Sequence, residues 1–232
     1  MEPKIVGTTM PVLELNMQPN ETVFAEAGQL SWISMAMQMK TGISVGGQQT
    51  GFLGALGRVM SGGTLFMTEY TAVGGPGLIA FSSKLPGQIL PLEITPAQGY
   101  LVHRHGFMCA TPGVQFSIGF QQRLGAGVFG GTGLTMQRLR GQGQAWVELH
   151  GEVVVYDLQP GNTLRVHPGQ VGMFQEGVQF NIVTVPGIQN MFFGGSGLFL
   201  AALTGPGRVW LQSMALQHLA HAIQEYLPKP AG

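Results

Sequence analysis

The sequence predicts an all-β protein built from three tandem repeats and ending in a short C-terminal helix. Glycine and proline, with 37 and 14 residues, supply about a fifth of the 232 residues, against roughly 12% in average proteins, which indicates a chain rich in turns. Glycine-centred blocks recur three times at nearly equal spacing. One segment near the C-terminus lacks both residue types and has helical periodicity. With 44% hydrophobic residues, the chain can bury a large core.

The first recurring block is a Gly-Gly pair that precedes an apolar segment. The three copies are Gly62-Gly63-Thr64-Leu65-Phe66-Met67, Gly130-Gly131-Thr132-Gly133-Leu134-Thr135 and Gly194-Gly195-Ser196-Gly197-Leu198-Phe199. Each copy is followed by a turn and a second apolar segment, and these turns end at Gly77, Gly143 and Gly207. Two apolar runs around a Gly-x-Gly turn are typical of a β-hairpin, so we expect one such hairpin in each repeat.

A second recurring block consists of a short alternating strand, a proline-containing break, another strand and a glycine turn. Its three copies begin at Leu13-Glu14-Leu15, Leu92-Glu93-Ile94 and Leu164-Arg165-Val166. Because both blocks recur in the same order, we predict one domain over residues 1–232, with repeats at approximately 5–88, 89–160 and 161–212.

The segment 213–227 is the predicted C-terminal helix. Its apolar residues follow the spacing of one helical face: Leu216, Leu219, Ala220, Ile223 and Leu227. Ser213 is the expected N-cap, and Pro228 is expected to end the helix. We expect this helix to cover an edge or a face of a sheet.

With the repeats identified, the chain resembles the altered-inheritance-of-mitochondria family and its bacterial relatives over nearly its whole length. The matching stretches are Arg58 with Gly62-Gly63, Pro86-Gly87-Gln88-Ile89, Gly130-Gly131-Thr132-Gly133-Leu134, Gly151-Glu152-Val153, Gly194-Gly195-Ser196-Gly197-Leu198 and Val209-Trp210-Leu211-Gln212-Ser213. The resemblance implies a fold like that of the tryptophan RNA-binding attenuation protein, with three β-sandwich-like units about a pseudo-threefold axis. Where the family often has an acidic residue after the Gly-Gly pair, this chain has Thr64, Thr132 and Ser196. The resemblance assigns no reaction, because the bacterial members have no established activity and the mitochondrial members are linked to inner-membrane organisation.

His103 and His105 are the strongest metal-binding candidates in the sequence. In a strand, residues i and i+2 point to one face, so both imidazoles would reach a single ion. A site of this kind also needs a carboxylate nearby, and the sequence offers none; His150 and His167 are the distant residues that could complete it. We therefore predict that neither a metal nor another cofactor binds, and that His103 and His105 are exposed or edge-strand residues beside a glycine turn.

The other candidate motifs also favour structural interpretations. Gly125-Ala126-Gly127-Val128-Phe129-Gly130 matches Gly-x-Gly-x-x-Gly, but a predicted strand follows it where a dinucleotide-binding unit needs a helix. Cys109 lies in an apolar stretch and is expected to be a buried core thiol. Asp157 is the only aspartate and the glutamates are scattered, so no acid/base pair can be assigned. We predict no catalytic residues and a protein that is not an enzyme.

An apolar segment before the first Gly-Gly pair is the candidate interaction surface. If this segment is helical, one face carries Phe52, Leu53, Leu56, Val59 and Met60. Such a face would contact a protein partner, a membrane surface or a second copy of the chain. The alternative interpretation is an internal plug, because three repeats that pack together need such apolar connections.

Charge and cysteine usage narrow the class of function. The 11 basic and 11 acidic residues give a net charge of zero, which argues against nucleic-acid binding. One cysteine, together with an N-terminal sequence unlike a secretory signal, indicates a cytoplasmic protein. We predict a non-enzymatic interaction or scaffold protein that forms homo-oligomers, because few charges leave little repulsion between copies. The alternative is a small-ligand binding module or an enzyme with a site between repeats.

Overall fold

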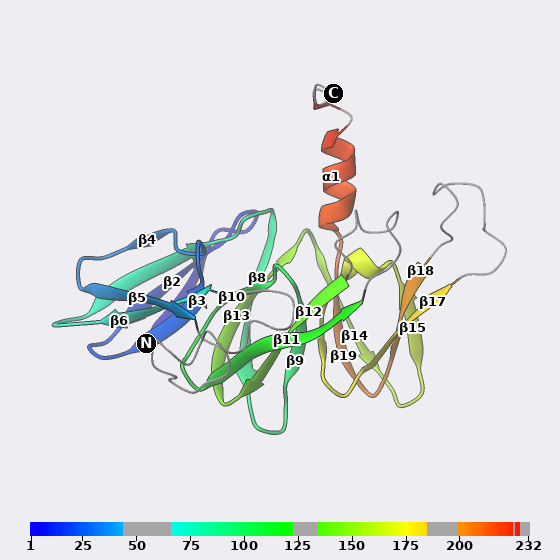
Figure 1. The fold of residues 1–232 in the computed structure, drawn as a ribbon, viewed down its shortest axis with the longest axis horizontal. Helices are drawn as coiled ribbons and strands as arrows, with labels where there is room; N and C mark the ends of the chain where they lie inside the picture. Colours follow the sequence, from blue (N-terminus) through cyan, green and yellow to red (C-terminus); the bar gives the residue numbers. More distant parts are fainter. Residues whose placement is uncertain (44–65, 123–133, 185–198, 225, 228–232) are drawn as a thin grey trace.

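A computed structural model describes residues 1–43, 66–122, 134–184, 199–224 and 226–227 (Figure 1). These residues form antiparallel strands and one short C-terminal helix, which confirms the predicted all-β class. After β1 (Glu2–Val6), the strands fall into three units. Unit 1 contains β2 (Val12–Met17), β3 (Thr22–Glu26), β4 (Trp32–Ile33), β5 (Met37–Ile43), β6 (Phe66–Ala72) and β7 (Gly77–Ser82). Unit 2 contains β8 (Gly87–Ile94), β9 (Tyr100–His103), β10 (Phe107–Ala110), β11 (Val114–Gln122), β12 (Leu134–Gly141) and β13 (Gly143–His150). Unit 3 contains β14 (Val153–Leu158), β15 (Thr163–Val166), a 3-10 turn (Pro168–Gln170), β16 (Val171–Gln175), β17 (Gln179–Thr184), β18 (Phe199–Thr204) and β19 (Gly207–Gln212).

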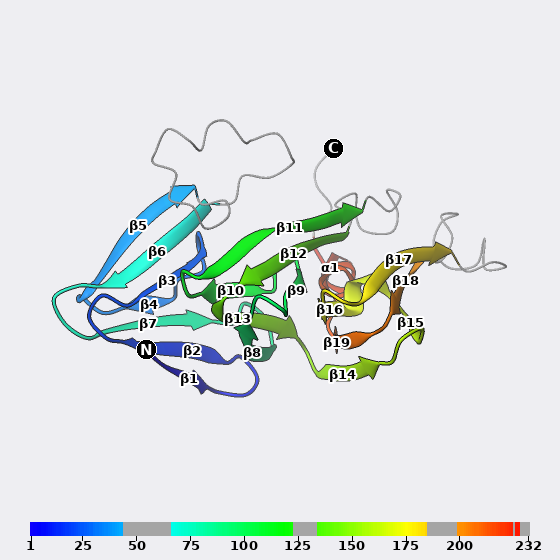
Figure 2. The same cartoon turned by 90° about the horizontal axis from the view of Figure 1, so that it is seen from below.

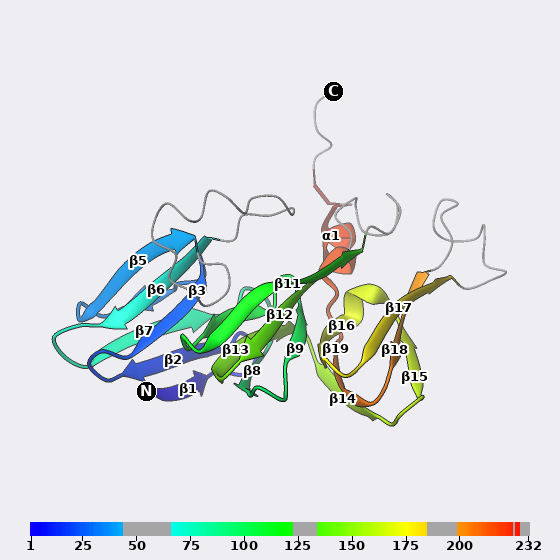
Figure 3. The same cartoon turned by 60° about the horizontal axis from the view of Figure 1, so that its bottom comes forward.

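The strands of each unit pair in the same way. In unit 2, β13 lies between β8 and β10, while β12 lies between β11 and β9. The same arrangement recurs as β2-β7-β4 with β5-β6-β3 in unit 1, and as β14-β19-β16 with β17-β18-β15 in unit 3. Each unit therefore has two three-stranded layers, which Figure 3 shows on the two sides of unit 3.

The sheets continue across the boundaries between units. β10 of unit 2 pairs with β3 of unit 1, and β16 of unit 3 pairs with β9 of unit 2. Two six-stranded sheets result, β5-β6-β3-β10-β13-β8 and β11-β12-β9-β16-β19-β14. The three units follow one another along the longest axis of the molecule, so they are equivalent units in succession and do not close into a ring within one chain (Figures 1 and 2).

The glycine turns after β6, β12 and β18 are corners between layers, and the predicted hairpins at these turns are wrong. β12 and β13 are consecutive in sequence, yet they belong to different sheets. Gly141 has a φ of +101°, and a Cβ on it would lie 2.4 Å from the Gly113 carbonyl oxygen, so this corner requires glycine. Within the three units, the paired strands that are consecutive in sequence are β5–β6, β11–β12 and β17–β18, and their Gly-Gly connections lie outside the described residues.

Burial along the strands follows their positions in the layers. β2 alternates, with Leu13, Leu15 and Met17 fully buried and the residues between them more exposed. By contrast, every residue of β13 from 145 to 150 is buried, because the strand has a core on each face. Trp146 belongs to the core of unit 1, while Val147 belongs to the core of unit 2.

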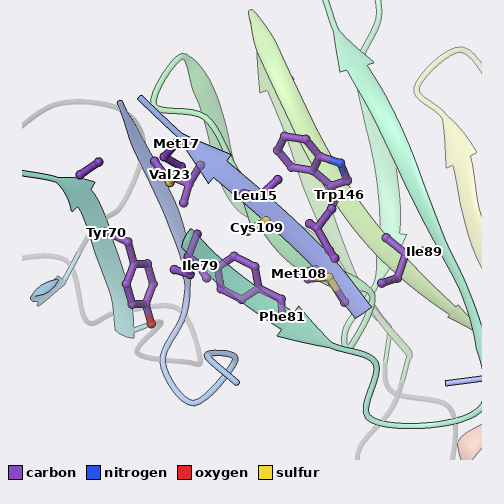
Figure 4. Close-up of a cluster of buried hydrophobic side chains, with 13 residues drawn as sticks. Leu15, Met17, Val23, Tyr70, Ile79, Phe81, Ile89, Met108, Cys109 and Trp146 are labelled. Carbon is purple, nitrogen blue, oxygen red and sulfur yellow. The ribbon is translucent and has the colours of Figure 1, made fainter. Parts of the chain in front are cut away.

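The core of unit 1 is completed by unit 2. Residues from β2, β3, β6 and β7 of unit 1 meet Ile89, Met108, Cys109 and Trp146 of unit 2 in one buried cluster (Figure 4). Cys109 is fully buried, as predicted. The hydrophobic cores, like the sheets, are therefore shared between neighbouring units.

The C-terminal region differs from its prediction in two respects. The helix α1 (Leu216–Gln224) begins after Ser213, whose hydroxyl instead accepts a hydrogen bond from the Glu152 N–H (2.8 Å) and pins the end of β19. The helix projects away from the sheets and Ile223 is 47% exposed, so it does not cover a sheet along its length (Figure 1).

The third unit also begins earlier than residue 161. Its first strand by pairing is β14, so Leu164–Val166 is the second strand of its unit, whereas Leu13–Leu15 and Leu92–Ile94 lie in first strands. The sequence blocks looked alike because first and second strands are both short, apolar and followed by a turn.

Candidate functional site

Two incomplete sheets at opposite ends of the molecule form the first candidate site. Among the strands that the structure describes, β4 is one of the two outer strands of the sheet β1-β2-β7-β4 in unit 1, and β15 is one of the two outer strands of the sheet β15-β18-β17 in unit 3. Figures 1 and 2 both place β4 at one end of the long axis and β15 at the other. An outer strand has one row of backbone N–H and C=O groups without a neighbouring strand, so it can accept a strand from another chain.

The junctions inside the chain define what such an edge can bind. At the junction of units 1 and 2, Cys109 of β10 lies opposite Ala25 of β3. At the junction of units 2 and 3, Met173 of β16 lies opposite Val102 of β9. All four side chains are fully buried, so each junction combines strand pairing with a closed apolar core.

A buried polar cluster near the first junction is the second candidate site. His103 ends β9, and its ring lies edge-on to the ring of His150 with centroids 5.1 Å apart. The His103 Nε2 atom is 3.2 Å from the Glu148 carbonyl oxygen, which places the proton of the neutral imidazole on Nε2. Glu148 is also buried, and its Oε2 accepts a hydrogen bond from the Lys84 N–H (3.0 Å). These contacts attach the segment after β7 in unit 1 to β13 in unit 2.

His103 and His105 do not face the same side, and His103 is not exposed. Residues 104–106 form the turn between β9 and β10, so the strand spacing rule does not apply to this pair. His103 is 7% exposed because β9 lies between β12 and β16, whereas His105 is exposed in the turn. His167 lies elsewhere, with its ring 4.6 Å from that of His218. Among the residues that the structure describes, no three His, Cys, Asp or Glu side chains are grouped to hold a metal ion.

Burial shifts the ionisation of this cluster. It lowers the pKa of His103 to about 3, and the neighbouring His150 lowers it further than burial alone. Burial also lowers the pKa of His150 to about 4, with smaller effects of His105 and Lys84. The pKa of Glu148 is raised by burial and partly restored by the Lys84 N–H. Neither buried ring nitrogen of His150 has a hydrogen-bond partner among the described residues, and burial favours the neutral imidazole.

A pocket between units 2 and 3 is the third candidate site. Its volume is about 500 Å³, and its polar lining includes Gln98, Gln115, Arg140, Gln175 and Glu176. Glu176 pairs with Arg140 (2.7 Å) and with Arg138 (2.8 Å), so one carboxylate is shared by two guanidinium groups. The pocket is thus a concave surface between two repeats that carries charged side chains.

The predicted interaction residues Phe52, Leu53, Leu56, Val59 and Met60 lie outside the described residues, as does the segment 125–130. Their assignment as an interface or an internal plug stays a prediction. Sequence reasoning missed the open edges β4 and β15, because strand pairing is not local. A signal was present in Trp146 and Trp210, which occupy equivalent positions at the two internal junctions once the pairing is known.

Thiol reagents are expected to label Cys109 only when the chain unfolds. Burial raises the pKa of the Cys109 thiol well above its ordinary value, so almost no thiolate is present and no reagent can reach it. Labelling with a chromogenic disulfide at pH 8 measures the rate, and the denatured chain should give one thiol. Complete labelling of the folded protein within minutes would contradict the buried position.

Comparison with known proteins identifies a family, a relative and a solved structure that this chain resembles. Residues 4–214 match the model of the family described as Mitochondrial biogenesis AIM24. An uncharacterised protein of Streptococcus pyogenes serotype M6 is 26% identical over 221 residues, which cover 94% of this chain and 87% of that protein. The crystal structure of another Streptococcus pyogenes protein superposes with a TM-score of 0.75 at 21% identity, covering 97% of this chain and 99% of that one, and this likeness shows the fold. No helix among the described residues is both long and apolar enough to cross a bilayer. The chain belongs to the Mitochondrial biogenesis AIM24 family.

Proposed function

We propose that this protein is a non-enzymatic scaffold that associates with further copies of itself. One observation carries the proposal: two sheets run across unit boundaries inside the chain, and two partial sheets are left at its ends. A chain that already joins its units by strand pairing can join other copies by the same contact.

The distribution of reactive groups supports a structural role. His103 is held by the Glu148 carbonyl oxygen and Cys109 lies in a core, so these residues serve packing and hydrogen bonding. Neither has the open setting that a nucleophile or a general base needs. We place the scaffold activity at the ends of the molecule and not at the buried polar cluster.

Native mass spectrometry and sedimentation velocity test the proposal. We expect masses that are multiples of the 24.7 kDa chain and that persist on dilution into the low micromolar range. Particles of one chain mass at every concentration up to about 100 µM would overturn it.

The same spectra test a second candidate function, a small-ligand site in the pocket between units 2 and 3. The Glu176 carboxylate with two arginines, together with the glutamine side chains, would suit a small polar molecule with both donors and acceptors. A retained small molecule, lost in a Glu176→Gln variant that keeps its fold, would favour this function.

A further inference from the structure

We propose that copies of this chain join head to tail, with β15 of one copy pairing antiparallel with β4 of the next. The inference rests on the proposed self-association and names the two surfaces that carry it. The occupant of each open edge is therefore a second copy of the same chain, presented through its opposite end.

The strand order of the sheets supports this pairing. Each unit has six strands, which can be numbered 1 to 6 in chain order. In both six-stranded sheets, strands 4, 5 and 2 of one unit are followed by strands 3, 6 and 1 of the next unit. The three-stranded sheet β17-β18-β15 is the first half of that order. The strands β4-β7-β2 are the second half, with β1 added at the far edge. Joining β15 to β4 thus creates a third sheet with the order found twice inside the chain.

The backbone of β4 presents hydrogen-bonding groups to its open side. Ser34 N–H donates to the Leu78 carbonyl oxygen (2.8 Å), next to the opposed residues Ile33 and Ile79. In an antiparallel pair the bonded and non-bonded positions alternate, so Ile33 turns its own N–H and C=O away from β7. Its equivalent in β10, Ala110, lies opposite a residue of the preceding unit.

β15 presents the complementary groups. Gly205 N–H donates to the Asn162 carbonyl oxygen (3.0 Å), next to the opposed residues Thr163 and Thr204. By the same alternation, Arg165 turns its N–H and C=O away from β18. The exposed edges of β4 and β15 therefore both carry donors and acceptors that point outward.

The side chains at the internal junctions follow a common arrangement. Cys109 lies opposite Trp146, and Met173 lies opposite Trp210, so each junction places one indole beside a smaller residue on the paired strand. Cys109 belongs to the core of unit 1 and Met173 to the core of unit 2, which in each case is the preceding unit. Side chains at this position thus close the core of the unit before their own.

At β4 the same position again pairs a large side chain with a smaller one, but here the indole is on the third strand of the unit and the smaller residue is on the sixth. Trp32 lies opposite Ala80, so the large side chain is on β4 and the small one on β7. Trp32 is 45% exposed, whereas its equivalents Cys109 and Met173 are fully buried. The core that this indole would close is that of unit 3 in the neighbouring copy, where Leu164 and Val166 of β15 are only partly buried.

Two variants block one end each. Trp32→Lys places a charge where the indole would be buried, and Arg165→Pro removes an outward N–H from β15. Each is expected to weaken association at least about 30-fold, the loss typical of an interface hot spot, and to leave particles of one chain mass. Matched controls lie on β14, another outer strand: Tyr156→Lys (44% exposed) and Val155→Pro (45% exposed) should assemble like the wild type.

A mixture of the two blocked variants gives the decisive measurement. The Trp32→Lys chain keeps a working β15 and the Arg165→Pro chain keeps a working β4, so their mixture should form a heterodimer and nothing larger in native mass spectra. Circular dichroism of each variant verifies the fold. Folded variants that assemble like the wild type, or a folded mixture without heterodimers, would overturn the head-to-tail pairing. A wild-type protein that never assembles would instead overturn the proposed scaffold function itself.

Discussion

Replacing Trp146 with alanine is expected to lower the free energy of unfolding by about 3–5 kcal/mol, as for other buried aromatic residues. Trp146 is 1% exposed and lies on β13 of unit 2, yet it fills the core of unit 1. Its indole N–H has no hydrogen-bond partner among the described residues, so the loss comes from apolar contacts and from the cavity left at the junction. Urea unfolding followed by circular dichroism at one fixed protein concentration measures it.

Two further variants serve as controls for the Trp146→Ala measurement. Trp146→Phe keeps most of the ring volume and loses no hydrogen bond, so it should cost much less than alanine. Tyr156→Ala removes an aromatic ring from an exposed strand face and should change stability by only about 0.5 kcal/mol. A Trp146→Ala protein as stable as the Tyr156→Ala protein would show that the core of unit 1 does not depend on unit 2.

Acidification below about pH 6.5 is expected to destabilise the fold through the buried histidines. Their folded pKa values, about 3 for His103 and about 4 for His150, lie below the ordinary value of 6.5. The unfolded chain therefore binds protons in this range that the folded chain does not, and stability falls by up to about 1.4 kcal/mol per pH unit for each histidine. The loss runs from pH 6.5 down to the folded pKa. Urea titrations between pH 7 and pH 4 measure the slope.

Substitutions in the cluster should change this slope with opposite signs. His150→Leu removes a group that cannot be protonated without cost, so it should flatten the pH dependence. Glu148→Gln should make it steeper, because the raised pKa of Glu148 lets the folded state take up a proton first and so opposes the histidines as pH falls towards 4.5. Equal slopes in wild type and His150→Leu would show that other groups control the acid response.

The repeat was predictable because glycine spacing is a local property of the chain. Glycine recurs at the corner positions 77, 143 and 207, and at Gly143 and Gly207 the backbone has a positive φ that favours glycine. The sheet that the strand after such a turn joins could not be predicted, because strand pairing depends on residues that are distant in the sequence. The same limit applied to the buried histidines: His103 and His150 are well separated in sequence and meet only after β9 and β13 are placed.

The burial of Cys109 was predictable for a similar reason, since an apolar tetrapeptide beside a glycine turn is typical of a strand in a core. Its position in the core of unit 1 was not predictable, because the sequence around Cys109 does not indicate which of the two neighbouring cores its side chain enters. The helix prediction succeeded over residues 216–224, where periodicity applies, and failed at Ser213, whose hydroxyl binds a distant N–H.

The shared cores have a consequence for the evolution of the chain. A tandem repeat is commonly regarded as a set of modules that can be added or deleted one at a time, because each repeat of a solenoid contacts only its neighbours. Here, deletion of unit 2 would remove Met108, Cys109 and Trp146 from the core of unit 1 and would leave β16 without its partner β9. The stability of each repeat therefore depends on the repeat beside it, so a core substitution in one unit is constrained by the residues of its neighbour.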